Sequence, residues 1–244
     1  MSQDPSSDSN TLLQPRFVLA AIVITLIAVF AVVLAVSPPG AGVAGGPSAD
    51  RPPGAALEPA PQPAPTDSVC GLQAGDQTVP AGIAPATDWE LVGTVAAPIA
   101  PDTIGPGTNQ SGLRSCYARS PLGALYAAAN FLAGTSDPNL RSRIVRDLTA
   151  NGAGREAAIR AVNARPAGSA GTGLQIRGFS FFNYDANAAT IDVAFELDGV
   201  RLHLVVSLRW ESGDWKVLVP LNGDLYAGIQ AIPDLTGYVL WSGA

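Results

Sequence analysis

Hydrophobic and polar positions divide the chain into three stretches with different patterns. Between Phe17 and Val36 the apolar residues follow one another, and Thr25 is the only polar interruption. From Ser37 onward large apolar residues are rare, and further along they recur with the periods of helices and strands. This pattern predicts a membrane helix, a linker and one folded domain over residues 70–244.

The apolar run 17–36 has the length of a transmembrane helix. Its 20 residues, at a rise of about 1.5 Å each, would span the hydrocarbon core of a bilayer. A cleaved signal peptide usually has a shorter apolar region that follows a basic stretch, whereas residues 1–16 hold two aspartates and one arginine. We therefore expect an uncleaved single-pass anchor that contacts the lipid bilayer through residues 17–36.

Charge and cysteine positions predict the orientation of this anchor. Arg16 precedes it, and the first basic residue after it is Arg51. The positive-inside rule then places the tail 1–16 in the cytoplasm and the folded domain outside the cell membrane. Cys70 and Cys116 are the only cysteines, and an oxidising compartment favours a disulfide between them. The alternatives are two free buried thiols or a redox pair, and the spacing is unlike C-x-x-C.

Residues 37–69 are rich in proline and glycine. Such a stretch cannot bury enough apolar surface to offset the entropy lost on ordering, so we expect a disordered linker of polyproline II character. It would hold the domain away from the membrane while keeping it local.

Helical patterns come first in the domain. Ser120-Pro121 and Asp137-Pro138 are helix starts, with a capping side chain before a proline. We expect one helix that ends at Gly134, a second after Pro138, and a third over 155–164. Earlier in the domain, 89–95 and 113–118 are expected to be short strands.

The pattern then changes to period two. Four strands are expected over 174–184, 191–197, 200–210 and 215–219, with a tight turn at Asp198-Gly199. Strict alternation in the first strand places Ile176, Phe182 and Tyr184 on one face, opposite Phe179 and Phe181. The C-terminal stretch 221–244 is too apolar for a free tail, so we expect a short helix and an extended segment that pack back. Together these elements predict an α+β fold, a curved antiparallel sheet with helices packed on one face.

Composition excludes several function classes. The formal net charge is −6, and a net-acidic chain without a cluster of basic residues is unsuited to direct nucleic acid binding. One histidine and two cysteines are too few for most multi-ligand metal sites, so neither a metal nor a cofactor is expected.

Arginines gather in the helical region of this acidic chain. A solvated helix face is the simpler interpretation, and a docking surface for an acidic partner is the alternative. The candidates for docking are Arg141, Arg143, Arg146, Arg155 and Arg160.

Acid–base chemistry has one candidate constellation. His203 alternates with the apolar positions of its strand, so we expect it on the wetter face of the sheet. Asp192 and Glu196 share the polar face of their own strand and are expected to form a solvated row. If the polar face were instead concave, His203, Asp192 and Tyr184 could converge as a catalytic site. The solvated row is favoured, and no catalytic residue is assigned.

Helices that lead into an antiparallel meander resemble the nuclear-transport-factor-like (cystatin-like) cone fold. The W-x-x-G-D-W-K-V turn over 210–217 is similar to the closing hairpin of such domains. A short tail, one membrane helix, a linker and an outer domain resemble the bitopic inner-membrane component of type IV secretion and conjugation machines.

The chain also looks like an uncharacterised actinobacterial domain family of integrative conjugative elements. The matching stretches are Cys70-Gly71-Leu72, W-E-L-V-G-T from Trp89, and the segment from Cys116 to Asn130. Only one of the 14 basic residues is lysine, which fits a high-GC genome. The resemblance implies a non-enzymatic scaffold in a DNA-transfer apparatus, with other secretion-channel proteins and possible copies of itself as partners.

Two other functions are compatible with a cone fold. The domain could bind a lipid or another apolar ligand in a cavity, or act as a small-molecule isomerase or dehydratase.

Overall fold

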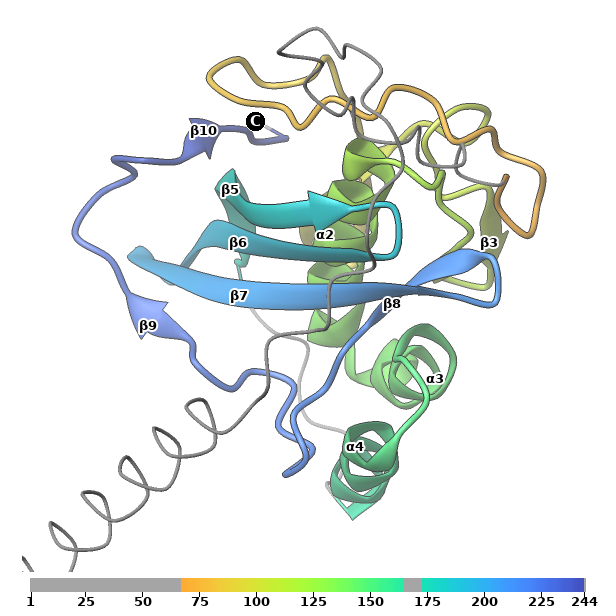
Figure 1. Cartoon of the computed structure of the whole chain (residues 1–244). Coiled ribbons are helices and arrows are strands. Elements are labelled where there is room, and N and C mark those ends of the chain that lie inside the picture. The colour runs from red at the N-terminus through yellow and green to blue at the C-terminus, as the bar shows by residue number, and fades with distance from the viewer. Residues whose placement is uncertain (1–66, 165–172, 244) are drawn as a thin grey trace, which may run out of the picture. The chain divides into compact units, whose positions relative to one another are not determined.

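The computed structural model of the protein describes residues 67–164 and 173–243. The predicted tail 1–16, the anchor 17–36 and nearly all of the linker 37–69 lie outside the described residues. No helix in the described part is both long and apolar enough to cross a membrane. The described part has an α+β fold, with a six-stranded antiparallel sheet, two small hairpins and three helices (Figure 1).

The three helices follow one another, and two of them begin at the predicted capping residues. They are α2 (Pro121–Ser136), α3 (Pro138–Leu148) and α4 (Ala153–Ala164). Ser120 Oγ accepts from the backbone N–H of Gly123, and the Asp137 carboxylate accepts from that of Asn139. The first helix extends past its predicted end at Gly134, because Pro138 forces only Asp137 into an extended conformation. Gly134 instead makes room for α3, since a Cβ there would lie 2.4 Å from Ile144 Cδ1.

The predicted four-stranded meander forms the centre of the main sheet. It consists of β5 (Gln175–Asp185), β6 (Ala188–Leu197), β7 (Val200–Glu211) and β8 (Asp214–Val217). Neighbouring strands pair antiparallel, in the order β5-β6-β7-β8. Asp198-Gly199 and Ser212-Gly213 form two-residue turns with positive φ at both positions, as hairpins of this length require.

Strict alternation along β5 is wrong. The register shifts between Ile176 and Gly178, and again between Phe181 and Asn183. Each β-bulge adds a residue and reverses the face that the following side chains occupy. Phe179 is therefore fully buried, whereas Phe182 is 62% exposed.

The predicted single strand over 89–95 is also wrong. A turn at Gly93-Thr94 divides the segment into β1 (Asp88–Val92) and β2 (Val95–Ile99), which pair as a hairpin. A second hairpin joins β3 (Thr108–Gln110) and β4 (Leu113–Ser115). The predicted strand over 113–118 ends early, because Cys116 has a left-handed φ of 65°.

The C-terminal segment contains no helix within the described residues, contrary to expectation. It forms β9 (Gln230–Ala231), which pairs with β7, and β10 (Val239–Leu240), which pairs with β5. The segment therefore runs from one edge of the sheet to the other and passes around its end (Figure 1). Proline or glycine recurs within every few residues from 220 to 237, which prevents a helix.

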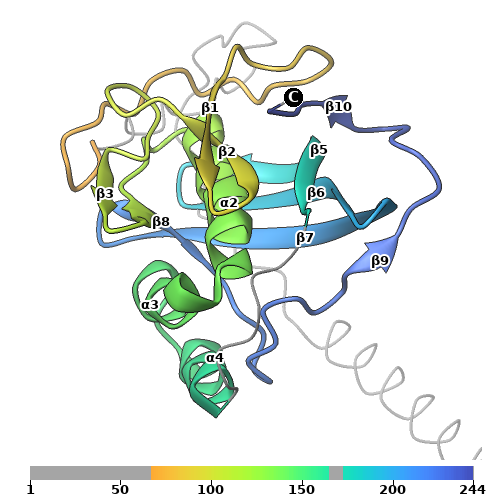
Figure 2. The same ribbon diagram turned by 180° about the vertical axis from the view of Figure 1, so that it is seen from behind.

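The helix α2 is the centre of the core. Figure 2 shows it between the sheet and the β1–β2 hairpin, and 14 of its 16 residues are buried. Its alanines allow close approach on both sides, and Ala133 packs with Val95 and Ala97 of the hairpin. On the sheet side large side chains fill the interface, including Phe179, Ile191, Leu208 and Trp215.

Candidate functional site

The predicted disulfide between Cys70 and Cys116 is present. It joins the start of the described chain to the segment that leads into α2, across a sequence separation of 46 residues. Closing a loop of this length stabilises a fold by about 4 kcal/mol in the chain-entropy model. We call this region the disulfide junction; its residues are Ser68, Val69, Cys70, Cys116, Gly213 and Asp214.

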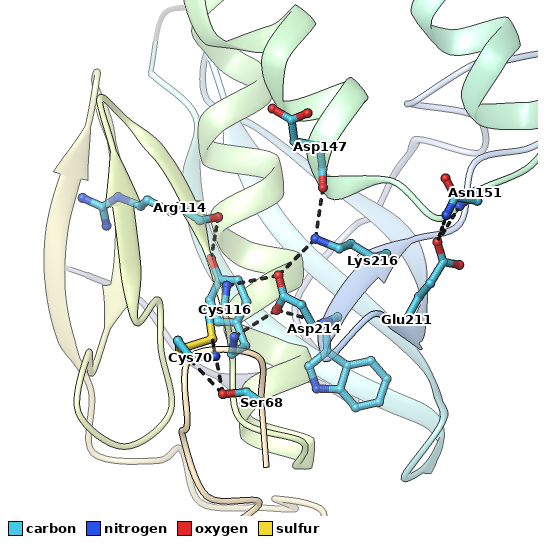
Figure 3. Close-up of polar contacts among 11 residues, drawn as sticks. Ser68, Cys70, Arg114, Cys116, Asp147, Asn151, Glu211, Asp214 and Lys216 are labelled. Atoms are coloured by element: carbon cyan, nitrogen blue, oxygen red, sulfur yellow. Dashed lines mark hydrogen bonds and ion pairs between the residues drawn. A yellow bond between two sulfur atoms is a disulfide. The ribbon is translucent and has the colours of Figure 1, made fainter. Parts of the chain in front are cut away.

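A buried carboxylate organises the Cys116 side of the junction (Figure 3). Asp214 is 2% exposed, and its oxygens accept from the backbone N–H of Cys116 at 3.1 Å and of Tyr117 at 2.9 Å. Lys216 Nζ lies 3.2 Å from Oδ2 of the same carboxylate. Burial, and then the negative charge of Asp214, raises the pKa of Tyr117 well above its usual value. The sequence offered no means of identifying Asp214 as this acceptor, because Cys116 and Tyr117 lie 98 and 97 residues away in the chain.

The W-x-x-G-D-W-K-V turn fastens the β7–β8 hairpin to its surroundings. Trp215 Nε1 donates to the carbonyl of Ala118 at 2.9 Å, and the ring of Trp210 meets that of Trp215 edge-on. The Arg119 guanidinium lies 5.3 Å from the Trp210 ring centroid, a cation–π distance. Lys216 Nζ donates to a backbone carbonyl at the end of α3. The motif therefore holds the hairpin against the segment before α2.

The chain is already fixed two residues before Cys70. Ser68 is 7% exposed and exchanges backbone and side-chain hydrogen bonds with Leu72. The Val69 N–H donates to the Gly213 carbonyl in the β7–β8 turn at 2.8 Å. Ser68 Oγ lies 3.3 Å from Cys116 Sγ. Ser68 and Val69 fall within the predicted linker 37–69, and no pattern in the sequence distinguished them from it.

Asp192 is buried and contacts His203, so the expectation of a solvated row is wrong for Asp192. Asp192 is 4% exposed, and its two oxygens lie 2.9 and 3.0 Å from His203 Nδ1. The Tyr238 hydroxyl donates to Asp192 Oδ2 at 2.6 Å. Burial, followed by the Asp192 hydrogen bond and charge, raises the pKa of Tyr238 well above its usual value. The C-terminal segment covers these groups, and no pattern in the sequence indicated where this segment would pair with the sheet.

Tyr184 does not join this cluster. Its hydroxyl donates to Gln77 Oε1 at 2.7 Å, and burial raises the pKa of Tyr184 to about 12. The Asp192–His203 pair resembles the orienting half of an acid–base site, because the carboxylate fixes one ring nitrogen. Here the second carboxylate oxygen is committed to Tyr238, so the pair also pins the C-terminal segment to the sheet.

The five candidate docking arginines divide into two groups. Arg141, Arg143 and Arg155 donate to backbone carbonyl oxygens of the domain, at 2.8, 3.0 and 2.9 Å. Arg146 and Arg160 are exposed, and neither side chain donates a hydrogen bond within the described residues. The guanidinium groups of this second pair are therefore exposed without such an internal contact.

A hollow of about 510 Å³ lies beside the C-terminal end of the chain. Trp89, Arg177, Leu240 and Trp241 contribute to its lining. Trp89 and Trp241 contact each other, with ring centroids 4.7 Å apart. Potential metal ligands do not gather in groups of three or more anywhere in the described part.

Comparison with known proteins identifies a family without a known activity. The model of DUF8175, a domain of unknown function, matches residues 50–240. No curated protein and no solved structure matches the chain. Because the family model covers most of the chain, the protein belongs to the DUF8175 family.

Proposed function

We propose that this protein is a non-enzymatic, membrane-anchored assembly subunit of a conjugation apparatus of the type IV secretion kind. The anchor 17–36 would hold it in the cell membrane, with the N-terminus in the cytoplasm and the domain outside. The observation that carries the proposal is the disulfide-stapled domain placed after a linker and an apolar run of membrane-spanning length.

The order of the elements supports the proposed resemblance to the cone fold. Three helices precede an antiparallel meander, and α2 lies against one face of that sheet. The finer assignment, to the nuclear-transport-factor-like (cystatin-like) fold and to an actinobacterial conjugative-element family, is part of the proposal.

A largely filled interior, with a pocket of only about 100 Å³ beside Phe131 and Leu204, favours a role at the surface of the domain. Phe131, Phe179 and Trp215 are at most 2% exposed and occupy the space between α2 and the sheet. A cone that encloses a ligand needs a cavity there, lined by apolar side chains with a few polar groups. This packing supports contact with other proteins rather than enclosure of a small molecule.

Arg146 and Arg160 are the proposed docking residues for an acidic surface of a secretion-channel protein. Both are exposed on helices, and an exposed guanidinium can bind a carboxylate through two parallel hydrogen bonds. Copies of the same chain are a second class of partner.

Co-purification of the full-length protein tests this role. After crosslinking in cells and extraction in a mild detergent, we expect other membrane components of the channel to be recovered, and mass spectrometry identifies them. Arg146→Glu with Arg160→Glu should lower their recovery about tenfold, since each reversal removes a favourable charge contact. Arg146→Lys with Arg160→Lys keeps the charge and is the matched control. Recovery of the full-length protein alone, as a monomer, would contradict the proposal.

The ligand-binding alternative has a specific location in the hollow beside Trp89 and Trp241. Native mass spectrometry of the intact protein would detect a bound lipid or apolar molecule, and Trp89→Ala should release it. For the isomerase or dehydratase alternative, His203→Ala and Asp192→Ala should abolish the biological activity.

A further inference from the structure

We propose that the disulfide junction transmits mechanical tension from the linker directly to the core, so that residues 71–115 carry none of it. The inference rests on the proposed anchoring, because a tethered domain that binds a second body is pulled through its linker. It adds a function to the disulfide beyond stabilising the fold.

The junction gives the incoming chain two connections to the core. Cys70 is covalently joined to Cys116, which lies five residues before the first residue of α2. Val69 donates to the carbonyl of Gly213, so the preceding residue is bonded to the β7–β8 turn. A pull toward the N-terminus therefore reaches the centre of the domain within three residues of Ser68.

The segment that follows the disulfide on the core side, 116–118, is held by hydrogen bonds at each of its residues. The Asp214 carboxylate holds the backbone N–H groups of Cys116 and Tyr117, and Trp215 Nε1 holds the carbonyl of Ala118. Figure 3 shows the carboxylate between this segment and Lys216. A disulfide to a loose loop would let tension pull that loop out of place. This disulfide instead ends on a buried segment that hydrogen bonds hold to the core.

The bypassed residues include the hairpins β1–β2 and β3–β4, which pair with no strand of the main sheet. Two-stranded hairpins depend on packing for their stability, and the β1–β2 hairpin packs on α2. Pulling from one end would break the hydrogen bonds of a hairpin one pair after another. Loss of β2 would also uncover Ala133 and the neighbouring face of α2.

Single-molecule stretching of the full-length protein in a lipid nanodisc tests the inference. One handle is attached to the cytoplasmic tail and the other to an azide-bearing residue at Asn163, at the exposed end of α4. The oxidised protein should open in one high-force event. After reductant is added to the same folded molecule, an earlier low-force step should appear, with an extension of up to about 150 Å from release of residues 71–115.

Two variants sharpen the result. Asn109→Ala removes a hydrogen bond to Gly112 in the β3–β4 turn, inside the bypassed segment. It should leave the opening force of the oxidised protein unchanged and lower the force of the early step after reduction. Asp214→Asn keeps the disulfide but loosens the segment 116–118, so it should lower the opening force of the oxidised protein.

The inference is overturned if the reduced protein, with both thiols shown free by alkylation, opens without an early step. It is also overturned if Asn109→Ala lowers the opening force of the oxidised protein, because residues 71–115 would then bear tension. Neither result affects the co-purification experiment, so failure of this inference and failure of the assembly role are distinguishable.

Discussion

At the scale of single residues, Asp214 is the polar group that holds the disulfide junction together. Its carboxylate is almost fully buried and accepts from backbone groups that belong to another part of the chain. A buried carboxylate with several donors stabilises the fold, whereas donors that lose it remain buried without a partner.

Asp214→Ala should lower the free energy of unfolding by roughly 3 kcal/mol, because three backbone N–H groups, of Cys116, Tyr117 and Trp215, lose their acceptor and Lys216 loses its ion pair. Urea unfolding of the full-length protein in detergent measures this. Asp102→Ala, at an exposed carboxylate, is the control and should change the stability by less than about 0.5 kcal/mol. A comparable loss in both variants would contradict the assigned role.

Raised tyrosine pKa values predict a loss of stability in alkali. The folded-state pKa of Tyr184 is about 12, and that of Tyr238 is raised by burial and by Asp192. An unfolded tyrosine has a pKa of about 10. The unfolded state therefore releases its protons first, and stability should be complete below pH 10 and fall as the pH rises toward 12 and beyond.

Unfolding experiments between pH 9 and pH 12 measure this slope, and phenolate absorbance follows the ionisation itself. Tyr184→Phe removes one titrating group and should make the decline shallower. An unchanged slope would mean that the hydroxyl of Tyr184 ionises equally easily in both states.

At the scale of elements, the two hairpin turns of the meander have the same length but different surroundings. Gly199 and Gly213 both have φ near 80°, a region that a side chain enters at a cost. A Cβ on Gly199 would meet nothing within 4 Å, whereas one on Gly213 would lie 3.0 Å from the backbone of Val69. Only the second turn is in contact with the incoming chain.

Gly199→Ala should therefore cost about 1–2 kcal/mol, from backbone strain alone. Gly213→Ala should cost more, because the same strain is joined by displacement of Val69 and loss of its bond to the turn. Urea unfolding compares the two variants, and hydrogen exchange at the Val69 amide should accelerate only in Gly213→Ala. Equal costs with equal exchange would show that the Val69 contact contributes nothing.

At the scale of the whole molecule, long-range connections close the fold. The disulfide ties the incoming chain to α2, and the C-terminal segment ties both edges of the sheet together. The Tyr238–Asp192–His203 cluster lies beneath that segment and pins it to β6 and β7.

Cys70→Ala with Cys116→Ala should lower the free energy of unfolding by roughly 4 kcal/mol, which corresponds to the loop that the disulfide closes. Urea unfolding of the oxidised, reduced and substituted proteins checks this. The reduced and substituted proteins should agree with each other, and the oxidised protein should unfold at a higher urea concentration. Coincident transitions for all three would show that the disulfide adds no stability.

The sequence by itself determined those features that depend on neighbouring residues. Ser120 and Asp137 start helices because a capping side chain reaches only two or three residues ahead. The Asp198-Gly199 turn follows from the backbone preferences of two residues. The disulfide was predictable because only two cysteines exist.

The tertiary structure alone decided the rest, because it depends on residues that are distant in the chain. The two bulges in β5 change its register against β6, and Phe182 lies outside the core. Asp214 binds the backbone of Cys116 and Tyr238 binds Asp192, and these partners lie 98 and 46 residues away in the chain. Local preferences therefore specify the helices, strands and turns. Strand register, side-chain burial and polar partners depend instead on which distant segments pack together in the core.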